Sequence, residues 1–335
     1  MSEIKTIFRS AVLSILAILL FPYAEKTEQA PPDTPEPLLL VIEHSEAETE
    51  KRGTPVRLKT DAGIIETELE EYLVQVVLSE MPASFEPEAL KAQAVAARTF
   101  ALKKMASRKH DGFDLCTDAA CCQAWTGTEE LKEKFGEDFP AVWQKASDAV
   151  GQTAGEAIYY GGELIEATYF SCSGGITEDA VAVWGAEVPY LQSVISPGEE
   201  FAPRYSSDVL IPAAEFAETL RQENAACSFD EKPESWVGGT TYTDGGGVKE
   251  VFIGGQLFSG TQLRRIFGLN STRFDLSCSD GNFLFAVRGF GHRVGMSQYG
   301  ADNMAKQGFD YRTILQYYYQ GVSIEKNNPG QSPGP

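Results

Sequence analysis

The sequence predicts an α+β fold in which helices are mixed with short antiparallel hairpins, as a single large body with room for a smaller subdomain. Three observations lead to this prediction. The 335 residues are 43% hydrophobic and 23% charged, an ordinary globular composition with enough apolar side chains for a core. Helical stripes and glycine-turn hairpins follow one another irregularly, without the strand–helix alternation of a parallel sheet. No internal repeat of fixed period is visible in the sequence.

The first expected elements are a strand and a helix. Residues 64–66 (Ile-Ile-Glu) follow a turn and predict a strand, and Thr67 with Glu70 three residues later predicts a capping box that opens a helix. Pro82 disfavours helical geometry at the residue before it, so this helix should end at about Glu80. Apolar side chains recur along it at helical spacing and form one stripe: Leu69, Tyr72, Leu73, Val76 and Val77.

A second helix should run from Pro87 to Met105, because proline is favoured at the first helical position and the many alanines allow close packing. Two pairs of glycines predict hairpins over residues 157–170 and 251–258. The remaining expected elements are a short helix from Thr261, a strand over 283–287, and helices over 296–307 and 311–319.

The N-terminal segment, residues 1–24, indicates export. Lys5 and Arg9 precede an uncharged apolar run over 11–24. As a helix this run spans about 21 Å, less than the hydrocarbon core of about 30 Å, and its length therefore favours a signal peptide. Ala24 offers only a poor cleavage motif, so an uncleaved membrane anchor is the alternative.

The rest of the chain divides into a linker, a body and a tail. Residues 25–54 are expected to form a Pro-rich extracytoplasmic linker, since four prolines fall within 27–37. The folded body is expected over 55–325. Residues 326–335 have turn formers and nothing to bury, which predicts a disordered tail.

The charge of the chain excludes one class of partner. Lys and Arg number 28 and Asp and Glu number 48, for a formal net charge of −20. Most of such a surface repels a phosphate backbone, so nucleic acid is not an expected partner.

Glu80 is the residue that most strongly suggests chemistry. It continues the apolar stripe of the first helix, so its carboxyl group should face the packed side, where a carboxylate is costly. It also lies in the last helical turn, where the helix dipole opposes negative charge. Both effects favour the protonated acid, which can donate a proton near neutral pH. The alternative is a helix-end glutamate that bends out to water.

Four soft ligands within 13 residues form a second constellation: His110, Cys116, Cys121 and Cys122. Four nitrogen and sulfur ligands can close a tetrahedral zinc site, and a closed site leaves no position for water, so this zinc would be structural. The spacing is not a common zinc-finger pattern. Disulfides, which export allows, and free thiols remain alternative interpretations.

Several motifs in a fixed order resemble the stage II sporulation protein D family. They are Ser79-Glu80-Met81-Pro82, the helix over 88–100, Phe170-Ser-Cys-Ser-Gly-Gly175 and the glycine-rich stretch over 289–301. The resemblance covers roughly residues 55–325. It implies that this body is the catalytic domain of a membrane-anchored lytic transglycosylase, which cuts peptidoglycan glycan strands at the septum during engulfment in sporulation. Relatives that enhance cell-wall amidases imply an amidase as partner, and they also support an alternative function, a non-catalytic glycan-binding activator of such an amidase.

The resemblance also implies roles for individual residues. Glu80 matches the catalytic glutamate of the family, and His110, Cys116, Cys121 and Cys122 match its zinc-binding segment. Cys121 replaces a histidine of that pattern and makes the set Cys3His. Arg293 and Cys172 are further departures, where the family usually has Gly and Ser. Five side chains are expected to hold the glycan around Glu80, since polar and aromatic groups suit sugars: Arg98, Gln123, Tyr169, Ser171 and Gln298.

A single glutamate suffices for this chemistry. Ordinary glycosidases need two carboxylates. In a lytic transglycosylase the C6 hydroxyl of the sugar attacks its own anomeric carbon, and one residue serves first as acid and then as base.

The remaining cysteines raise two further hypotheses. Cys172 could pair with His292 as a nucleophile and base, although no third member is evident and His292 has a simpler interpretation as a loop histidine bonded to backbone. Cys227 and Cys278 are left over from the zinc cluster, and in an oxidising compartment they are predicted to form a disulfide.

Overall fold

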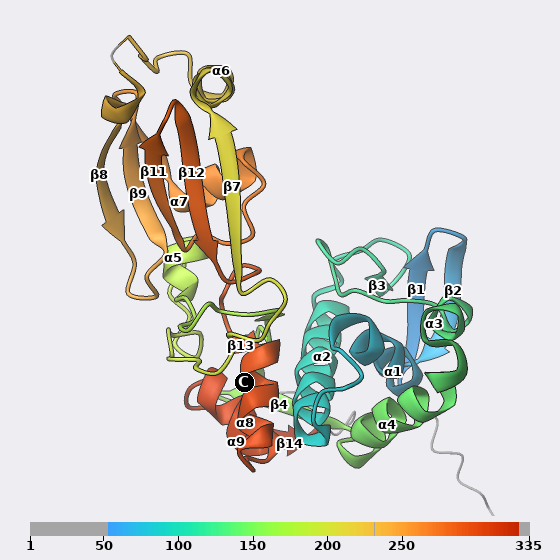
Figure 1. Cartoon of the computed structure of the whole chain (residues 1–335). Coiled ribbons are helices and arrows are strands. Elements are labelled where there is room, and N and C mark those ends of the chain that lie inside the picture. Colours follow the sequence, from blue (N-terminus) through green and yellow to red (C-terminus); the bar gives the residue numbers. More distant parts are fainter. Residues whose placement is uncertain (1–52, 231, 328–335) are drawn as a thin grey trace, which may run out of the picture. The chain divides into compact units, whose positions relative to one another are not determined.

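The computed structural model describes residues 53–230 and 232–327 (Figure 1). The expected export segment 1–24, nearly all of the linker and the last eight residues lie outside this range. Within the described range, no helix combines the length and the apolar character needed to cross a membrane.

The described residues form helices mixed with small, mostly antiparallel sheets, which confirms the predicted α+β class. The helices are α1 Leu69–Glu80, α2 Pro87–Ser107, α3 Thr128–Phe135, α4 Phe139–Gln152, α5 Ala180–Trp184, α6 Ala213–Glu223, α7 Gly260–Ile266, α8 Gln298–Lys306 and α9 Tyr311–Tyr318.

The strands pair as follows. An order β2-β1-β3 joins β1 Pro55–Thr60, β2 Gly63–Glu68 and β3 Leu115–Cys116, and an order β14-β4-β5 joins β14 Ser323–Lys326, β4 Glu156–Tyr160 and β5 Glu163–Leu164. Two further three-stranded sheets have the orders β11-β12-β7 (Phe274–Ser279, Asn282–Arg288, Ser206–Pro212) and β10-β9-β8 (Gln256–Ser259, Val248–Ile253, Val237–Tyr242). The short strands β6 Tyr169–Phe170 and β13 Met296–Ser297 pair in parallel.

Helix α2 lies at the centre of the larger hydrophobic core. It contacts α1, α4, α8, α9 and β4, and Figure 1 shows α1 and α4 beside it. Its buried residues point to every side, as expected of a helix enclosed by neighbours. Most of them are alanines, whose small side chains let the surrounding backbones approach closely. The apolar stripe predicted for α1 is buried in the same core.

A second hydrophobic core lies within residues 211–287 and contains a group of packed phenylalanine rings. Phe216 stacks on Phe283 with 3.9 Å between ring centroids and on Phe267 with 5.2 Å. The hairpin predicted over 251–258 and the helix after it are present here as β9, β10 and α7. A separate core agrees with the predicted smaller subdomain.

Three expectations about elements are corrected. Thr67 does not cap α1, because the β1–β2 pairing continues through it and keeps its backbone extended. The first predicted hairpin closes only at its turn, since β5 ends at Leu164 and Tyr169–Phe170 pairs instead with Met296–Ser297. Lys326, expected in the tail, belongs to strand β14.

Cys227 and Cys278 are not joined. All six cysteines of the chain lie within the described residues and all are free thiols there. The predicted disulfide between these two residues is therefore wrong for this structure.

Candidate functional site

Glu80 ends helix α1 with its side chain turned inward. Its Oε1 accepts a hydrogen bond of 2.9 Å from the backbone N–H of Ala124, and its Oε2 lies 3.4 Å from the amide nitrogen of Gln298. The side chain of Tyr169 also hydrogen-bonds to this carboxyl group. Burial raises the pKa of Glu80, and these three hydrogen bonds oppose the shift without cancelling it. The inward orientation predicted from the stripe is confirmed, and the alternative of a glutamate bent out to water is not.

Tyr169, which is partly buried, and the buried Gln123 form a polar pair next to Glu80. The amide of Gln123 donates to the Tyr169 hydroxyl at 2.7 Å, and the Tyr72 hydroxyl donates to the amide oxygen of Gln123 at 3.2 Å. Since the Tyr169 hydroxyl accepts the hydrogen bond from Gln123, its own proton is free to point at Glu80. Gln298 is held similarly by Gln93, at 3.5 Å.

A cavity of about 580 Å³ opens onto Glu80. Tyr169 and Ser171 line it, as expected of glycan-binding residues. Its walls also include aromatic rings that the sequence analysis did not single out for this purpose: Phe100, Phe170, Trp184 and Phe290. Aromatic faces beside a buried acid suit a ligand with both hydroxyl groups and apolar ring faces, such as a sugar.

A second carboxyl group, that of Glu166, lines the same cavity. It lies 3.8 Å from the ammonium group of Lys103 and 3.6 Å from that of Lys104. Two lysines thus balance its charge, whereas no cation forms an ion pair with Glu80 among the described residues. The two acids therefore have different environments, a difference typical of groups with different chemical roles.

Arg98 is not brought to the cavity. Its guanidinium is fully buried and forms an ion pair of 2.6 Å with Glu70 on α1. It also donates to the backbone oxygens of Val150 and Glu156, both at 3.2 Å. Every side of the guanidinium is thus engaged in joining α1, α2, α4 and β4, and the predicted glycan-binding role does not fit this geometry.

Gln123 and Gln298 lie near Glu80 but are not exposed to the cavity as expected of glycan-binding residues. Both are almost fully buried, so they reach a ligand chiefly through the groups that they hold, Tyr169 and Glu80. We therefore describe them as positioning residues.

His292 also lines the cavity but is bonded to backbone. Its Nδ1 accepts from the N–H of Val294 at 3.1 Å, which leaves Nε2 to donate to the backbone oxygen of Tyr169, also at 3.1 Å. Burial lowers the pKa of His292 to about 4, and the nearby charge of Arg264 adds to the shift. A neutral imidazole with both nitrogens occupied agrees with the simpler interpretation from the sequence.

Among the residues that the structure describes, none is placed to activate the Cys172 thiol. Its Sγ lies 3.7 Å from the backbone oxygen of Arg204, and burial raises the pKa of the thiol to about 12. A buried, protonated thiol is a poor nucleophile. The Cys172–His292 hypothesis is therefore not supported.

Arg293, the departure at a position where the related family has glycine, has φ of 67°, in the left-handed region that favours glycine. Interactions of its buried guanidinium offset the cost of this backbone conformation. The guanidinium donates to the backbone oxygens of Ser173, Ile176 and Gly245 and pairs with Glu178 at 3.7 Å.

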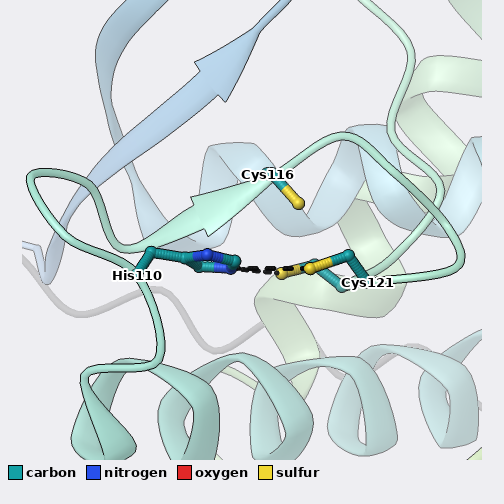
Figure 2. Close-up of side chains that lie close together, drawn as sticks. His110, Cys116 and Cys121 are labelled. Atoms are coloured by element: carbon teal, nitrogen blue, oxygen red, sulfur yellow. Dashed lines mark hydrogen bonds between the residues drawn. The ribbon is translucent and has the colours of Figure 1, made fainter.

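The four soft ligands predicted from the sequence lie together (Figure 2). Their ligand atoms fall within 4.8 Å of one another, with His110 Nε2 3.3 Å from Cys122 Sγ and 3.8 Å from Cys121 Sγ. Figure 2 shows the side chains of His110, Cys116 and Cys121 pointing toward a common centre. Zinc bonds of about 2.3 Å to sulfur and about 2.0 Å to nitrogen place tetrahedral ligands roughly 3.4–3.8 Å apart. The donor set and its spacing therefore fit a metal ion of this type.

Lys109 contacts this cluster from outside. Its ammonium group lies 3.2 Å from Cys121 Sγ and donates to the backbone oxygen of the same residue at 3.0 Å. Lys109 also lines the Glu80 cavity, so a single side chain borders both features.

The segment that leaves the cluster is fixed along α1. Trp125 donates through Nε1 to Gln75 at 3.2 Å, and Ser79 hydrogen-bonds to Thr126 at 2.9 Å. The Ala124 N–H that bonds to Glu80 directly precedes these two anchors in the chain. Residues 121–126 therefore connect the four-ligand cluster to the candidate acid.

The Ala124 amide, Glu166 and the aromatic wall were not predicted from the sequence. No side-chain pattern marks a backbone N–H. Trp184 is a large aromatic residue that stays 46% exposed at the end of α5, and such exposure can indicate a binding surface. Its place in the cavity wall shows which surface this is.

The profile of a family described as "Stage II sporulation protein" matches residues 59–160. The chain is 40% identical over 276 residues to stage II sporulation protein D of Bacillus subtilis (strain 168), covering 81% of this chain and 78% of that protein. It is 38% identical over 279 residues to the protein of the same name in Bacillus amyloliquefaciens, covering 82% and 79%. An amidase enhancer of Bacillus subtilis is 27% identical over 301 residues, which cover 74% of this chain and 39% of that protein.

Proposed function

The chain belongs to the stage II sporulation protein D family, and from this premise we propose that it is a lytic transglycosylase that cleaves peptidoglycan glycan strands during sporulation. The observation that carries the proposal is Glu80, a partly buried acid of raised pKa that opens onto a cavity lined by aromatic rings.

The proposed reaction needs one acid that acts twice. Protonated Glu80 gives its proton to the glycosidic oxygen as the bond from that oxygen to the anomeric carbon breaks. The C6 hydroxyl of the same sugar then forms a bond to the anomeric carbon, and Glu80, now a carboxylate, takes the hydroxyl proton. The product is a 1,6-anhydro sugar, no water is consumed, and Glu80 returns to its protonated state.

The neighbours of Glu80 support both halves of this cycle. Burial favours the acid before the proton is transferred. The Ala124 N–H, the Tyr169 hydroxyl and the Gln298 amide stabilise the carboxylate afterwards. Because Oε1 accepts the backbone N–H, we assign the transferred proton to Oε2.

We further propose that His110, Cys116, Cys121 and Cys122 bind one structural zinc ion. When bound, the ion would crosslink the loop after α2 and leave no ligand position for water. It would hold the segment that carries Ala124 and would not take part in the chemistry. Metal analysis of purified protein tests this: one zinc per chain is expected, and loss of the metal in Cys116→Ser with full retention in Cys278→Ser.

For the cellular context, we propose that the chain is extracytoplasmic, anchored in the cell membrane through residues 1–24, and acts at the septum during engulfment. Cleavage and secretion are the alternative. Detection of the intact N-terminal peptide in the membrane fraction would support the anchor, and a mature chain that starts near residue 25 would contradict it.

The experiment that tests the activity is mass spectrometry of purified glycan strands after incubation with the protein. Anhydro ends that appear with wild type and not with Glu80→Gln support the proposal. Hydrated reducing ends would instead indicate a hydrolase that uses Glu166 as the second carboxylate, and Glu166→Gln would then abolish cleavage.

A second candidate function is activation of a cell-wall amidase through glycan binding, without cleavage. The observation that favours it is the similarity to an amidase enhancer. Unchanged glycan strands, together with faster release of stem peptides when a cell-wall amidase is added, would support this alternative. The effect should then be equal for wild type and Glu80→Gln.

A further inference from the structure

A second cavity, of about 420 Å³, lies next to the first and shares one wall with it. The shared residue is Phe290, which lines both cavities. The other walls come from helix α7 and the turn after it, including Arg264 and Arg265. Because a glycan is a linear polymer, a cavity that continues the one at Glu80 lies where neighbouring sugars of a bound strand can reach.

The charge of this second cavity differs from that of the whole chain. The chain carries a net charge of −20, yet two arginines gather around Phe290. Arg264 lines the cavity, and the guanidinium carbon of Arg204 lies 4.6 Å from the centroid of the Phe290 ring. Stacking of this kind holds a guanidinium in a defined orientation while its N–H groups remain available.

These two arginines lack acidic partners among the described residues. Arg265, beside Arg264 in the chain, forms an ion pair of 2.6 Å with Glu223. Arg264 and Arg204 form no ion pair within residues 53–230 and 232–327. Arg264 is partly buried and uses its Nε to donate to the backbone oxygen of Leu269 at 3.3 Å. Arg204 is exposed, but the partly buried guanidinium of Arg264 is costly without an anion, and an anionic ligand would offset this cost.

Arg264 is also close enough to the Glu80 cavity to act on it electrostatically. Its charge contributes to the lowered pKa of His292, which lines that cavity. The second cavity therefore adjoins the Glu80 cavity, and the charge of Arg264 acts on residues of both.

We propose that Arg264 and Arg204, together with the ring of Phe290, form a subsite that binds a carboxylate of the glycan substrate. This inference rests on the proposed function, because it places an acidic sugar of the bound strand beside the one that reacts. In peptidoglycan such a carboxylate has two sources. It is the free lactyl group of a muramic acid without a stem peptide, or a carboxylate of the stem peptide itself.

Binding of matched oligosaccharides tests the subsite in the Glu80→Gln background, where cleavage cannot intervene. The probes are peptide-free oligomers that contain muramic acid and chitin oligomers of equal length, which have no carboxylate. Calorimetry should give tighter binding of the muramic acid oligomer by roughly tenfold, as expected for a charge-assisted hydrogen bond. This preference should shrink at high salt, because salt screens an exposed ion pair.

Substitution assigns the preference to particular residues. Arg264→Gln or Arg204→Gln should reduce the preference severalfold and leave the affinity for chitin oligomers unchanged. Arg221→Gln is the matched control, since Arg221 also stacks on a phenylalanine, Phe229, but that ring lines neither cavity, whereas the Phe290 ring under Arg204 lines both. Arg264→Lys keeps the charge but not the Nε bond to Leu269, and it should retain most of the preference. If Arg264→Lys loses as much of the preference as Arg264→Gln, the loss comes from the broken bond to Leu269 at the end of α7 and not from the charge, and the subsite is wrong.

A third probe distinguishes the two sources of the carboxylate. Oligomers with intact stem peptides should bind through this subsite only if the peptide supplies the carboxylate. If instead the lactyl group supplies it, amidation of that group should abolish the preference as completely as Arg264→Gln does.

The proposed function and the subsite fail in different ways. Equal affinity of the Glu80→Gln protein for chitin oligomers, peptide-free muramic acid oligomers and oligomers with intact stem peptides overturns the subsite, even when wild type still produces anhydro ends. Absence of both glycan binding and cleavage overturns the proposed function.

Discussion

The Glu80 cavity and the four-ligand cluster are joined by a few residues of chain, yet they differ in how the charge of their polar side chains is compensated. Glu80 has hydrogen-bond donors but no cation to pair with among the described residues, and burial raises its pKa. The four ligands of the cluster face one another at distances that suit one ion, and Lys109 lies against one of them. We infer that the Glu80 cavity lowers the stability of the fold and keeps a reactive acid, while the four-ligand cluster raises the stability and holds the cavity in place.

The largest expected effect is that of Glu80→Gln on the rate. Loss of a general acid and base should slow glycan cleavage by about 10²- to 10⁴-fold. The amide removes a buried ionisable group, so the melting temperature should stay unchanged or rise slightly. Thermal melting together with product analysis checks both parts.

Glu71→Gln is the matched control for this variant, because Glu71 is exposed on the same helix. It should change neither rate nor melting. A clear fall in the stability of Glu80→Gln would mean that the two regions do not differ as we describe.

Removal of zinc should have the converse effect, a large loss of stability. An ion present at about 1,000 times its Kd adds about 4 kcal/mol to the folded state. For a chain of this size, this corresponds to roughly 10 °C in Tm. Differential scanning calorimetry with and without a chelator measures the shift.

Cys116→Ser should melt like the chelated protein and no longer respond to the chelator, whereas Cys278→Ser should respond as wild type does. The cluster should affect cleavage only through loss of local order around Ala124. A chelated protein that melts as before and keeps full activity would refute the structural zinc, and mass under non-reducing conditions would then test for disulfides.

Tyr169→Phe should have an intermediate effect in the cavity. It removes a hydroxyl that bonds to Glu80 and also leaves the buried amide of Gln123 without its partner at 2.7 Å. The rate should fall by about tenfold or more, and the free energy of unfolding by about 1–3 kcal/mol. Steady-state kinetics and denaturant unfolding measure the two losses. Tyr159→Phe, whose hydroxyl bonds to Asn327 at 3.1 Å, should leave the rate unchanged.

Lys109→Gln should weaken the proposed zinc site. Three thiolates, a neutral imidazole and Zn²⁺ sum to a charge of −1, which Lys109 balances from 3.2 Å. Loss of such a contact to a ligand typically lowers metal affinity by about 10-fold. Competition with a chromophoric chelator measures this.

The effect of Lys109→Gln should shrink in the Cys121→His background, where the cluster carries no net charge. An equal loss in both backgrounds would mean that Lys109 acts through folding alone and not through the charge of Cys121.

The smallest effect concerns pH. The pKa of Glu80 is raised in the folded state, so the fold disfavours its ionised form. The free energy of unfolding of the wild type therefore falls as pH rises from the ordinary pKa of a glutamate, about 4.3, through the raised pKa of Glu80. Glu80→Gln should match wild type in Tm at low pH and exceed it slightly above this window. Cleavage by wild type should fall over the same range, since the acid form is consumed.

Much of the fold could be predicted locally. The stripe of α1 and its end at Glu80, the start of α2 at Pro87, and the hairpin over 251–258 all depend on neighbours within a few residues, where propensity and periodicity act. The grouping of His110, Cys116, Cys121 and Cys122 also follows from short spacing, because a loop of 13 residues keeps its ligands near one another.

Only the tertiary structure decided which polar residues surround Glu80. Arg98 has the sequence context of a candidate ligand, but its partner Glu70 lies 28 residues away and turns it into a structural crosslink. Tyr169 reaches the cavity because Tyr169–Phe170 pairs with Met296–Ser297, more than 120 residues further along the chain, and no periodicity encodes such a pairing.

The sequence by itself therefore determined the class of fold, the inward-facing acid and the four-ligand set, while the tertiary structure decided the cavity, its aromatic wall and the arginines around Phe290. The physical reason is the range of the forces involved. Helix and turn preferences are set by bonded neighbours, whereas desolvation, hydrogen-bond partners and charge compensation depend on residues that meet only when distant segments pack together.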